Sequence, residues 1–377
     1  MALLMVALAA CTPGEPPPTP TASAPAPTDS LDYAMRALMD QDAVATVAQV
    51  RWPGGEWSKA YGVRDLDTRQ PAQPDDRVPV ASVTKTMTAV SVLKLVDEGL
   101  IGLDDPVNGI LDSFGAGLKP PATITLRHLL SHTSGMPSYG EALYRSVDDL
   151  IPASSQRLSL QRQMELTSTL PWEARSVGNF HYSDSNYVAL GLVLEKFRGK
   201  SYPEVLKEDI INPLGLSRTT VDDPLTDAQD LVHGYITIKG QRTEAGVTQE
   251  QLGSPSHGVV STMSDVNDFL AALFGGRLLT AGSLAEMQKT VAGPYGLGIF
   301  VWSEDCTGAP RFFGRGGFLD FRTIALSSAD GRYQATMTMA TPPMVSPLED
   351  PDVDRERDLW SDQIRSALLE TLDRLCT

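Results

Sequence analysis

The chain has 377 residues, of which 42% are hydrophobic, and a formal net charge of -16 at pH 7. This length and apolar content are ample for a large buried core, so a globular enzyme of one large domain or two close lobes is the default class. The 31 basic residues are scattered along the chain. This argues against a nucleic-acid-binding protein, which needs a concentrated basic surface.

The chain begins with a short apolar run that ends at Cys11. The run is too short to cross a bilayer, which takes about 20 residues, but it is typical of the end of a secretory signal. Leu8-Ala9-Ala10-Cys11 resembles a bacterial lipobox, although no Lys or Arg precedes it. We therefore expect residues 1–11 to be a lipoprotein signal with a lipidated Cys11. The alternatives are a start codon placed too late and a chance apolar N-terminus.

Residues 12–30 are rich in Pro, Thr, Ala and Ser. Such a stretch cannot bury a core and is typical of an extended spacer. A spacer after a lipid anchor predicts an exported protein held at the outer face of the bacterial cytoplasmic membrane. The alternative is an ordinary disordered N-terminus. The globular domain is then predicted to span residues 31–377.

Within that domain, period-2 patterns and turn signals predict strands at both ends. Residues 43–52 and 56–63 form a predicted hairpin across Pro53-Gly54-Gly55. Helices are predicted over residues 84–99, 126–131, 186–197, 202–211 and 265–273, because of their apolar faces and terminal signals. Strands then follow over 295–301, 311–314, 321–326 and 333–339, with an amphipathic helix over 354–375.

This order predicts an α+β fold. The simplest arrangement joins the N- and C-terminal strands in one antiparallel sheet, packs the last helix on it, and inserts a mainly helical lobe of about residues 100–290. Ligands favour the crevice between such lobes.

Ser82-Val83-Thr84-Lys85 places a hydroxyl and an amine three residues apart on one helix face. A neutral lysine beside a serine can take its proton and make it a nucleophile. The pattern alone is weak, because Ser91-Val92-Leu93-Lys94 also matches. Ser82, however, lies at a strand-to-helix junction, where free backbone N–H groups favour developing negative charge. The alternative for Ser82 is a plain N-cap serine.

Two histidines in the segment of residues 124–136, His128 and His132, have the i, i+4 spacing of a helical metal site. The glutamate of an H-E-x-x-H motif is missing, because Leu129 stands in its place. Buried or capping histidines are therefore expected, with no metal and no cofactor.

Two further segments carry candidate chemistry. Tyr182, in a loop before a helix, becomes a candidate proton carrier when it accompanies Ser82 and Lys85; read alone, it is a packing residue. In Arg315-Gly316-Gly317-Phe318 the glycines indicate a close backbone approach, and the cation suits a carboxylate-bearing substrate. The backbone N–H of Phe318 could pair with that of Ser82 as an oxyanion hole. The alternative is a tight hairpin with an exposed arginine.

Taken together and in this order, these segments resemble the serine β-lactamase and D-alanyl-D-alanine carboxypeptidase family. The branch is the one of class C β-lactamases, the Streptomyces-type DD-peptidase and related esterases. The resemblance covers about residues 33–375. It implies a β-lactamase/transpeptidase-like fold, a Ser82 acyl-enzyme, and a base role shared by Lys85 and Tyr182. No G-x-S-x-G elbow occurs, so a Ser-His-Asp esterase is set aside.

The sequence departs from this family at two positions. The resemblance assigns substrate binding to Asp184, Arg315, Gly316, Gly317 and Phe318. The motif Tyr182-Ser183-Asp184 ends in aspartate where the family usually has asparagine. An ionised Asp184 cannot donate to a substrate carbonyl, but it could hold Lys85 charged and shift base duty onto Tyr182. Arg315 stands where the family has Lys or His, and arginine gives up no proton. Cleavage of a peptide or an ester is therefore expected at least as much as efficient penicillin hydrolysis.

Cys306 and Cys376 are the two cysteines outside the predicted signal. In an oxidising compartment a disulfide between them is expected. Their positions also look like those of the disulfide in the Streptomyces enzyme. The alternative is two unrelated thiols.

The predicted function is a cell-envelope serine hydrolase of the carboxypeptidase, β-lactamase or esterase type. Its substrate would be a small molecule or peptide, such as a peptidoglycan stem peptide. A rival reading is a catalytically inactive module, tethered at the surface, that binds cell-wall peptide or a protein partner.

Overall fold

The computed structural model describes residues 26–110, 124–172, 176–223, 225, 228–304 and 308–376. The predicted signal with Cys11, most of the predicted linker, and Cys306 lie outside these residues. Lipidation at Cys11 and the disulfide between Cys306 and Cys376 therefore remain predictions.

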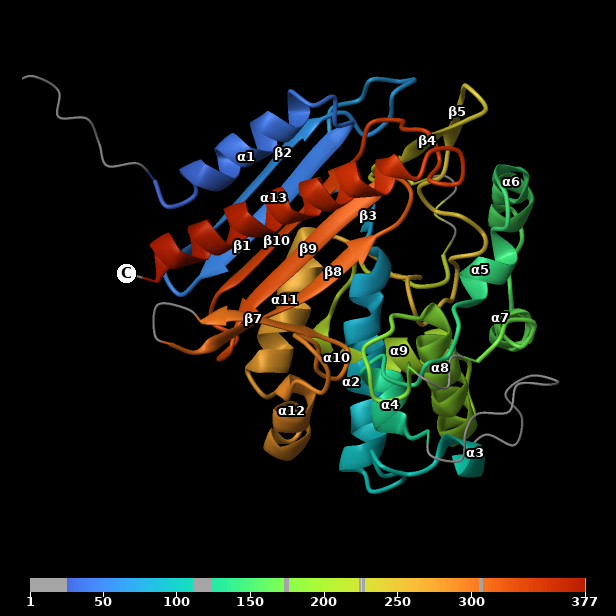
Figure 1. Ribbon diagram of the computed structural model, residues 1–377. Helices are drawn as coiled ribbons and strands as arrows, with labels where there is room; N and C mark the ends of the chain where they lie inside the picture. Colours follow the sequence, from blue (N-terminus) through green and yellow to red (C-terminus); the bar gives the residue numbers. More distant parts are fainter. Residues whose placement is uncertain are drawn as a thin grey trace, which may run out of the picture.

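A six-stranded antiparallel sheet in the order β2-β1-β10-β9-β8-β7 forms the centre of the molecule (Figure 1). β1 pairs with β10 along its length, with Ala45 opposite Ala340. The prediction that the N- and C-terminal strands share one sheet is therefore confirmed. The strands are β1 (Ala45–Trp52), β2 (Gly55–Gly62), β7 (Phe300–Glu304), β8 (Pro310–Gly317), β9 (Phe321–Ser328) and β10 (Gln334–Ala340).

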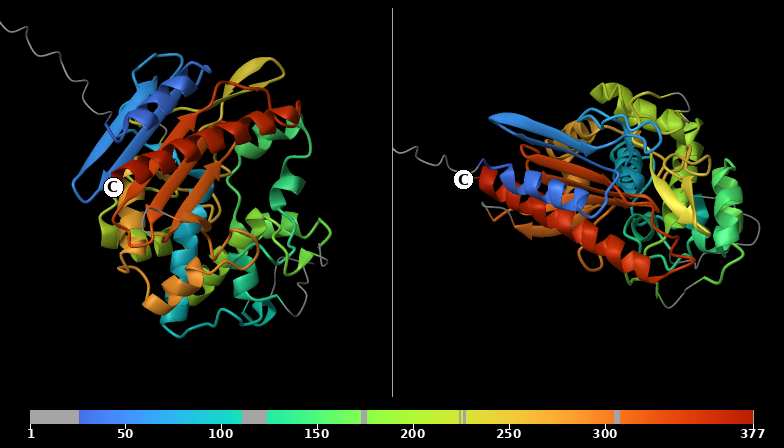
Figure 2. Two further views of the ribbon diagram at one scale, coloured as in Figure 1. Left: turned by 60° about the vertical axis from the view of Figure 1, so that its left-hand side comes forward. Right: turned by 90° about the horizontal axis from the view of Figure 1, so that it is seen from above.

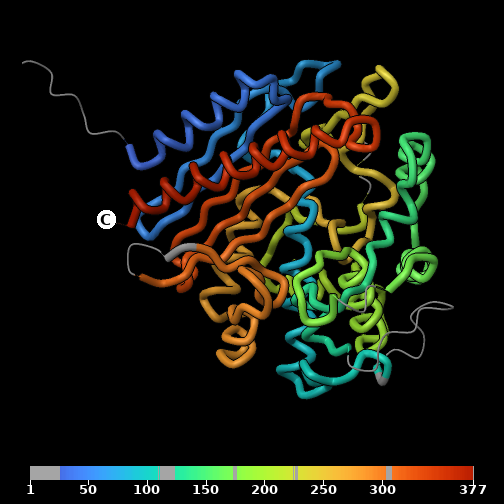
Figure 3. Tube along the Cα trace, viewed as in Figure 1, coloured from blue at the N-terminus to red at the C-terminus, as the bar shows by residue number. Residues whose placement is uncertain are grey.

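Two helices, α1 (Asp29–Met39) and α13 (Asp352–Leu375), lie side by side on one face of this sheet (Figure 2). The first and last helices thus run alongside each other on one side of the molecule, as the blue and red segments of Figure 3 show. The final helix was predicted, but α1 was not, and it begins inside the predicted linker. Its buried residues follow helical spacing: Leu31, Ala34, Met35 and Leu38.

The opposite face of the sheet is covered by α11 (Met263–Phe274) and by α2 (Thr84–Asp97). α2 is buried on nearly all sides, because the sheet lies on one side and the helical lobe on the other. The core that results joins both lobes, with Met87, Val90 and Leu93 of α2 fully buried within it. A residue on α2 is therefore well placed to face the boundary between the lobes.

The helical lobe consists mostly of short helices. They are α3 (Val107–Ile110), α4 (Leu126–Leu130), α5 (Tyr139–Leu143), α6 (Leu150–Ser154), α7 (Leu160–Thr167), α8 (Asp184–Arg198), α9 (Tyr202–Leu206) and α10 (Asn212–Leu214), with a π turn over Lys207–Ile211. α12 (Ala281–Gln288) follows α11. Two small sheets complete the fold, β3 (Val78–Pro79) with β6 (Val260–Ser261), and β4 (Tyr235–Ile238) with β5 (Gln241–Glu244).

One predicted strand is misplaced. Residues 295–301 were expected to form it, but β7 begins only at Phe300. Gly298 has a φ of 83°, which is outside the strand region. Its backbone also comes so close to α2 that a Cβ there would lie 2.4 Å from Ala89 Cβ. Gly298 therefore serves close packing against α2.

No helix among the described residues is both long and apolar enough to span a membrane.

A buried polar network ties α11 to the sheet. Asn267 Nδ2 donates to Gln49 Oε1 at 3.1 Å, and Thr336 Oγ1 donates to Asn267 Oδ1 at 2.6 Å. We expect Asn267→Ala to lower the free energy of unfolding by about 1–3 kcal/mol, because Gln49 and Thr336 would lose buried partners. Urea denaturation measures this. Asp268→Ala, one residue further on the same helix and half-exposed, is the control and should cost about 1 kcal/mol or less.

Candidate active site

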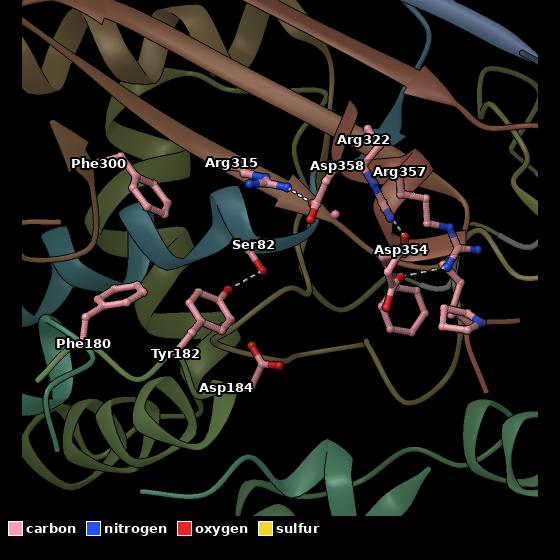
Figure 4. Close-up of a pocket in the computed structure, with 14 residues that line it drawn as sticks. Ser82, Phe180, Tyr182, Asp184, Phe300, Arg315, Arg322, Asp354, Arg357 and Asp358 are labelled. Atoms are coloured by element: carbon pink, nitrogen blue, oxygen red, sulfur yellow. Dashed lines mark hydrogen bonds and ion pairs between the residues drawn. The ribbon is translucent and has the colours of Figure 1, made fainter. Parts of the chain in front are cut away.

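The predicted nucleophile, Ser82, lies in a single 3-10 turn, η1 (Ala81–Val83), that leads directly into α2. Ala81 has a φ of 46°, a left-handed conformation that a residue other than glycine rarely adopts. Strain of this kind concentrates at functional sites. The turn places Ser82 at the wall of a pocket of about 490 Å³ between the sheet and the helical lobe (Figure 4).

Lys85 follows one helical turn later and is 1% exposed. Its Nζ lies 3.0 Å from Ser82 Oγ, 2.6 Å from Asp184 Oδ1 and 2.9 Å from the backbone carbonyl oxygen of Ser256. The expected meeting of the Ser82 hydroxyl and the Lys85 amine is therefore present. Asp184 and the Ser256 carbonyl can each accept one hydrogen bond from Lys85 Nζ. The remaining position on this nitrogen then points at Ser82 Oγ. That is the geometry in which an amine can exchange a proton with a serine.

Tyr182 closes the group from the loop before α8. Its hydroxyl donates to Ser82 Oγ at 2.8 Å, so the three predicted side chains meet at one atom. The ring stacks on His132 with a centroid separation of 4.3 Å. His132 Nδ1 lies 3.2 Å from the backbone nitrogen of Ser183, which donates to it. His132 therefore holds the Tyr182 ring in place.

The electrostatic surroundings keep Tyr182 protonated. Burial, followed by the carboxylate of Asp184, raises the pKa of Tyr182 well above that of an ordinary phenol. The pocket leaves 40% of the residue exposed, so solvent moderates the burial effect, but Asp184 acts in the same direction. A neutral phenol that donates to Ser82 is an acid, not a base. This environment disagrees with the expectation that base duty moves onto Tyr182.

Asp184 is the first residue of α8, where the helix dipole favours a negative charge. Burial alone would raise its pKa, but the nearby Lys85 and His257 lower the pKa of Asp184 below its usual value. Asp184 was predicted as a substrate-binding residue. The structure places it against Lys85 as a permanent anion, while its side chain also lines the pocket.

Strand β8 runs past Ser82 and supplies the other wall. A Cβ on Gly316 would lie 2.1 Å from the carbonyl oxygen of Val80, so only glycine allows this approach. Beyond Phe313, β8 has no ladder partner on the β7 side among the residues that the structure describes. The backbone N–H of Phe318 donates to Phe321 at 3.3 Å, on the β9 side.

Because neighbouring residues of a strand point their N–H groups to opposite sides, the N–H of Gly317 faces the free edge. Gly317 also lines the pocket with Ser82. The expected oxyanion donor, Phe318, is therefore wrong, since its N–H is used within the hairpin. The N–H of Gly317 is then the candidate partner of the Ser82 N–H in an oxyanion hole. The Phe318 side chain lines the pocket, with its ring centroid 6.1 Å from that of His257.

Arg315 does not offer a free cation. Its guanidinium forms an ion pair with Asp358 of α13 at the edge of the pocket (Figure 4). Arg315 was predicted to bind a substrate carboxylate, but its guanidinium is already paired with the carboxylate of Asp358. The sequence did not reveal this pair, because Asp358 is 43 residues away along the chain.

The two histidines in the segment of residues 124–136 have structural roles. His128 caps α4: its Nδ1 accepts from the backbone N–H of Thr125 at 3.2 Å. His132 is fully buried, and burial followed by Lys85 lowers the pKa of His132 well below its usual value, so it is neutral. These are the buried and capping roles that were expected. Within the described ranges, no group of three metal-ligating side chains is found.

The second Ser-x-x-Lys match is separate from the site. Ser91 is fully buried in the middle of α2, and Lys94 Nζ donates to the carbonyl oxygen of Asp209 at 2.6 Å. Neither residue lines the pocket. This pair provides matched control positions for experiments on Ser82 and Lys85.

Sequence reasoning missed several residues of the pocket. The backbone carbonyl of Ser256 leaves no side-chain signal. Arg357 could have been found, because it interrupts the apolar face of the predicted last helix, one turn before Trp360. Arg322, on β9, is mostly buried as well.

The fold and the serine–lysine–tyrosine group define a serine hydrolase in which a lysine one turn after the nucleophile replaces the usual histidine. The chain belongs to the Beta-lactamase family, whose family model matches residues 31–358. Penicillin-binding protein 4* of Bacillus subtilis is 28% identical over 188 residues, which is 48% of this chain and 40% of that protein. The chain thus matches less than half the length of that curated relative.

Two solved structures share the fold over nearly the whole chain. A D-stereospecific amidohydrolase from Streptomyces sp. has a TM-score of 0.76 at 24% identity, covering 90% of this chain and 98% of that one. D-amino acid amidase from Ochrobactrum anthropi SV3, complexed with L-phenylalanine amide, has a TM-score of 0.74 at 19% identity, covering 93% and 98%. The predicted fold class and family are confirmed.

Gly316→Ala should abolish efficient acylation while the protein stays folded. The new methyl group must push β8 away from η1, which moves the N–H of Gly317 out of line with that of Ser82. A displacement of about 1 Å at a reacting group lowers rates by roughly a hundredfold. Stopped-flow acylation by an activated ester measures this. Gly282→Ala in α12, where a Cβ meets nothing closer than 3.8 Å, is the control and should act like wild type.

Lys85→Ala should slow acylation of Ser82 at least a hundredfold, because the serine loses its proton acceptor. The matched control is Lys94→Ala on the same helix, which should leave the rate unchanged. Thermal unfolding checks that both variants fold. Equal acylation rates for Lys85→Ala and wild type would show that another group acts as the base.

Proposed function

We propose that the protein cleaves amide or ester bonds through a covalent acyl-enzyme on Ser82. The observation that carries this proposal is the convergence on Ser82 Oγ of an amine at 3.0 Å and a phenol at 2.8 Å. Lys85 takes the proton of Ser82, and Tyr182 holds a proton that it can give to the leaving group. Nucleophilic catalysis needs both.

The steps follow from the positions of these groups. Ser82 Oγ attacks the substrate carbonyl carbon as its proton passes to Lys85 Nζ, and the carbonyl oxygen becomes an oxyanion. The backbone N–H groups of Ser82 and Gly317 stabilise that oxyanion. The ammonium formed on Lys85 is neutralised by Asp184, 2.6 Å away. Asp184 thus supports the lysine as the aspartate of a Ser-His-Asp triad supports its histidine.

Tyr182 then protonates the leaving group as the carbon–heteroatom bond breaks, and recovers a proton from Lys85 by way of the same atoms. Water attacks the acyl-enzyme in the second half-reaction, giving its proton to the same relay, and the acid product leaves Ser82 free. The assignment of base to Lys85 and acid to Tyr182 rests on the raised pKa of Tyr182, which keeps the phenol protonated, and on the position of Lys85 Nζ 3.0 Å from Ser82 Oγ.

The substrates that fit best are amides or short peptides of D-amino acids, with esters as alternative acyl donors. Two lines support this choice. Proteins of the same fold are a D-stereospecific amidohydrolase and a D-amino acid amidase, and a curated relative is a penicillin-binding protein. Penicillin hydrolysis is a weaker proposal, since Arg315 is engaged by Asp358.

A place at the cell envelope is proposed from the sequence alone. It rests on the lipobox-like Leu8-Ala9-Ala10-Cys11 and the Pro-rich segment after it. A globomycin-sensitive shift in apparent mass, absent in Cys11→Ala, would support a lipid anchor. An unchanged mass in both cases would contradict it.

The rival proposal, an inactive binding module, rests on the departures at Asp184 and Arg315. The structure favours the enzyme, because Asp184 completes the surroundings of Lys85 and leaves Ser82 accessible from the pocket.

Wild-type protein from residue 26 onward should react covalently with a fluorophosphonate probe at Ser82, and Ser82→Ala should not. Ser91→Ala, the matched change on the helix that follows Ser82, should label like wild type. Intact-mass spectrometry measures the adduct. An unlabelled wild type that is nevertheless folded would favour the binding module. A screen with a D-alanine amide, a D-Ala-D-Ala peptide, p-nitrophenyl esters and a chromogenic cephalosporin then identifies the substrate class.

Tyr182→Phe should slow amide hydrolysis by roughly a hundredfold or more, as loss of a general acid does. It should slow hydrolysis of a p-nitrophenyl ester much less, because p-nitrophenolate leaves without a proton. Steady-state kinetics on the two substrates give this ratio. Equal losses would mean that Tyr182 acts on Ser82 itself and not on the leaving group.

A further inference from the structure

A glutamate and a histidine close to the catalytic group are buried, and the proposed steps use neither. Glu250 is 1% exposed and His257 is 8% exposed, and neither lines the pocket that contains Ser82. His257 directly follows Ser256, whose carbonyl oxygen accepts from Lys85 Nζ at 2.9 Å. Ionisable side chains are rarely buried unless they are paired, because a charge that leaves water is costly. This pair therefore requires an explanation.

The carboxyl group of Glu250 faces two potential donors, Tyr139 and His257. Its Oε1 accepts from the hydroxyl of Tyr139 at 2.6 Å. Burial, followed by Glu250, raises the pKa of Tyr139 well above that of an ordinary phenol, so this hydroxyl keeps its proton. The Oε2 of Glu250 has no hydrogen-bond partner among the described residues, but it lies 3.4 Å from His257 Nε2. A proton on that nitrogen would give the buried oxygen the donor that it lacks.

The other ring nitrogen of His257 also faces an acceptor. Nδ1 lies 2.6 Å from Ser256 Oγ, which in turn lies 3.0 Å from Ser254 Oγ. The Ser256 hydroxyl can accept from Nδ1 and donate to the next hydroxyl at the same time. Because both ring nitrogens then act as donors, the surroundings of His257 suit the imidazolium cation. The same contact holds Ser256, and with it the carbonyl group that binds Lys85.

His257 also acts on Lys85 through the charge of Asp184. Against the effect of burial, Lys85 and then His257 lower the pKa of Asp184. A carboxylate that faced the ammonium alone would hold the lysine proton firmly, and a protonated amine cannot take the proton of Ser82. A second cation beside the carboxylate weakens that hold, because it offsets part of the negative charge.

The other titratable groups around this cluster carry no charge. The phenols of Tyr139 and Tyr182 keep their protons, and His132 is neutral because of its burial. Burial likewise raises the pKa of Tyr187 and of Tyr295 above that of an ordinary phenol. The charged groups of the cluster are then Lys85, Asp184, His257 and Glu250, whose signs alternate.

We propose that His257, paired with Glu250, is a positioning residue that fixes Ser256 against Lys85 and, as a cation, weakens the hold of Asp184 on the lysine proton. Lys85 can then be neutral before the reaction, as the proton acceptor of Ser82 must be. After the transfer, Asp184 still lies 2.6 Å from the ammonium that has formed. This inference rests on the proposed function, because it takes Lys85 as the base.

The test is the pH dependence of Ser82 labelling by the fluorophosphonate probe, from pH 5 to pH 10. Labelling requires the proton transfer from Ser82, and fluoride leaves without a proton. Without the cation, neutral Lys85 becomes rarer at low pH. We expect His257→Gln to slow labelling about tenfold or more on the acid side of the profile, but only about threefold or less at pH 10. A residue that only supports the fold would slow labelling by the same factor at every pH.

Glu250→Gln should move the profile in the same direction, because His257 without its counter-ion stays neutral. This variant carries the test if His257→Gln does not fold, which thermal unfolding checks. The matched control is His233→Gln, since His233 also contacts a glutamate, Glu244 at 2.6 Å, and neither residue lines the pocket with Ser82. It should label like wild type at every pH.

Two results would overturn the inference: an acid side of the profile that does not move in the folded variant, or slowing by an equal factor across the whole pH range. A wild type that is not labelled at any pH would count against the proposed function instead. The two failures are therefore distinguishable in one experiment.

Discussion

The site depends on one buried amine. Lys85 comes from a helix that is enclosed by the sheet and the helical lobe, where an unpaired charge would be strongly destabilising. It is stabilised by a carboxylate from α8 and a backbone carbonyl from the segment before β6. The same contacts fix Nζ beside Ser82 Oγ. Stability and chemistry are thus linked, because the groups that stabilise the buried lysine are also those that orient its amine toward Ser82.

The carboxylate of Asp184 acts on both the proposed base, Lys85, and the proposed acid, Tyr182. A permanent carboxylate favours the lysine when it carries the transferred proton, and it keeps the nearby phenol from ionising. One charge therefore favours the protonated form of both neighbours, and their positions separate their roles: Lys85 Nζ is held 3.0 Å from Ser82 Oγ, while Tyr182 lines the pocket. An asparagine at this position would stabilise neither state so strongly.

Much of the fold and of the site could be predicted from local patterns. The hairpin at residues 43–63, the helix after Ser82 and the strand carrying Gly316 depend on neighbouring residues, and the structure has them close to the expected bounds. α1 was missed because it follows a Pro-rich segment that dominates the local composition. Residues 295–299 were misread as a strand, since their apolar character serves contact with α2.

What could not be predicted depends on contacts between distant segments. The ion pair of Arg315 with Asp358 and the use of the Phe318 N–H within the hairpin follow from how α13 and β9 meet β8. No spacing in the sequence encodes them. The family resemblance pointed to the glycine motif, and strand alternation indicates that the Gly317 N–H is the one directed away from β9.

The left-handed turn at Ala81 and the groups around it come from segments that are far apart in the chain. A nascent polypeptide that has emerged through α8 already carries Ser82, Lys85, Tyr182 and Asp184. It still lacks the carbonyl of Ser256, which anchors the amine, and the N–H of Gly317, which completes the oxyanion hole. The proposed site therefore becomes complete only after β8 has been made, near the end of synthesis.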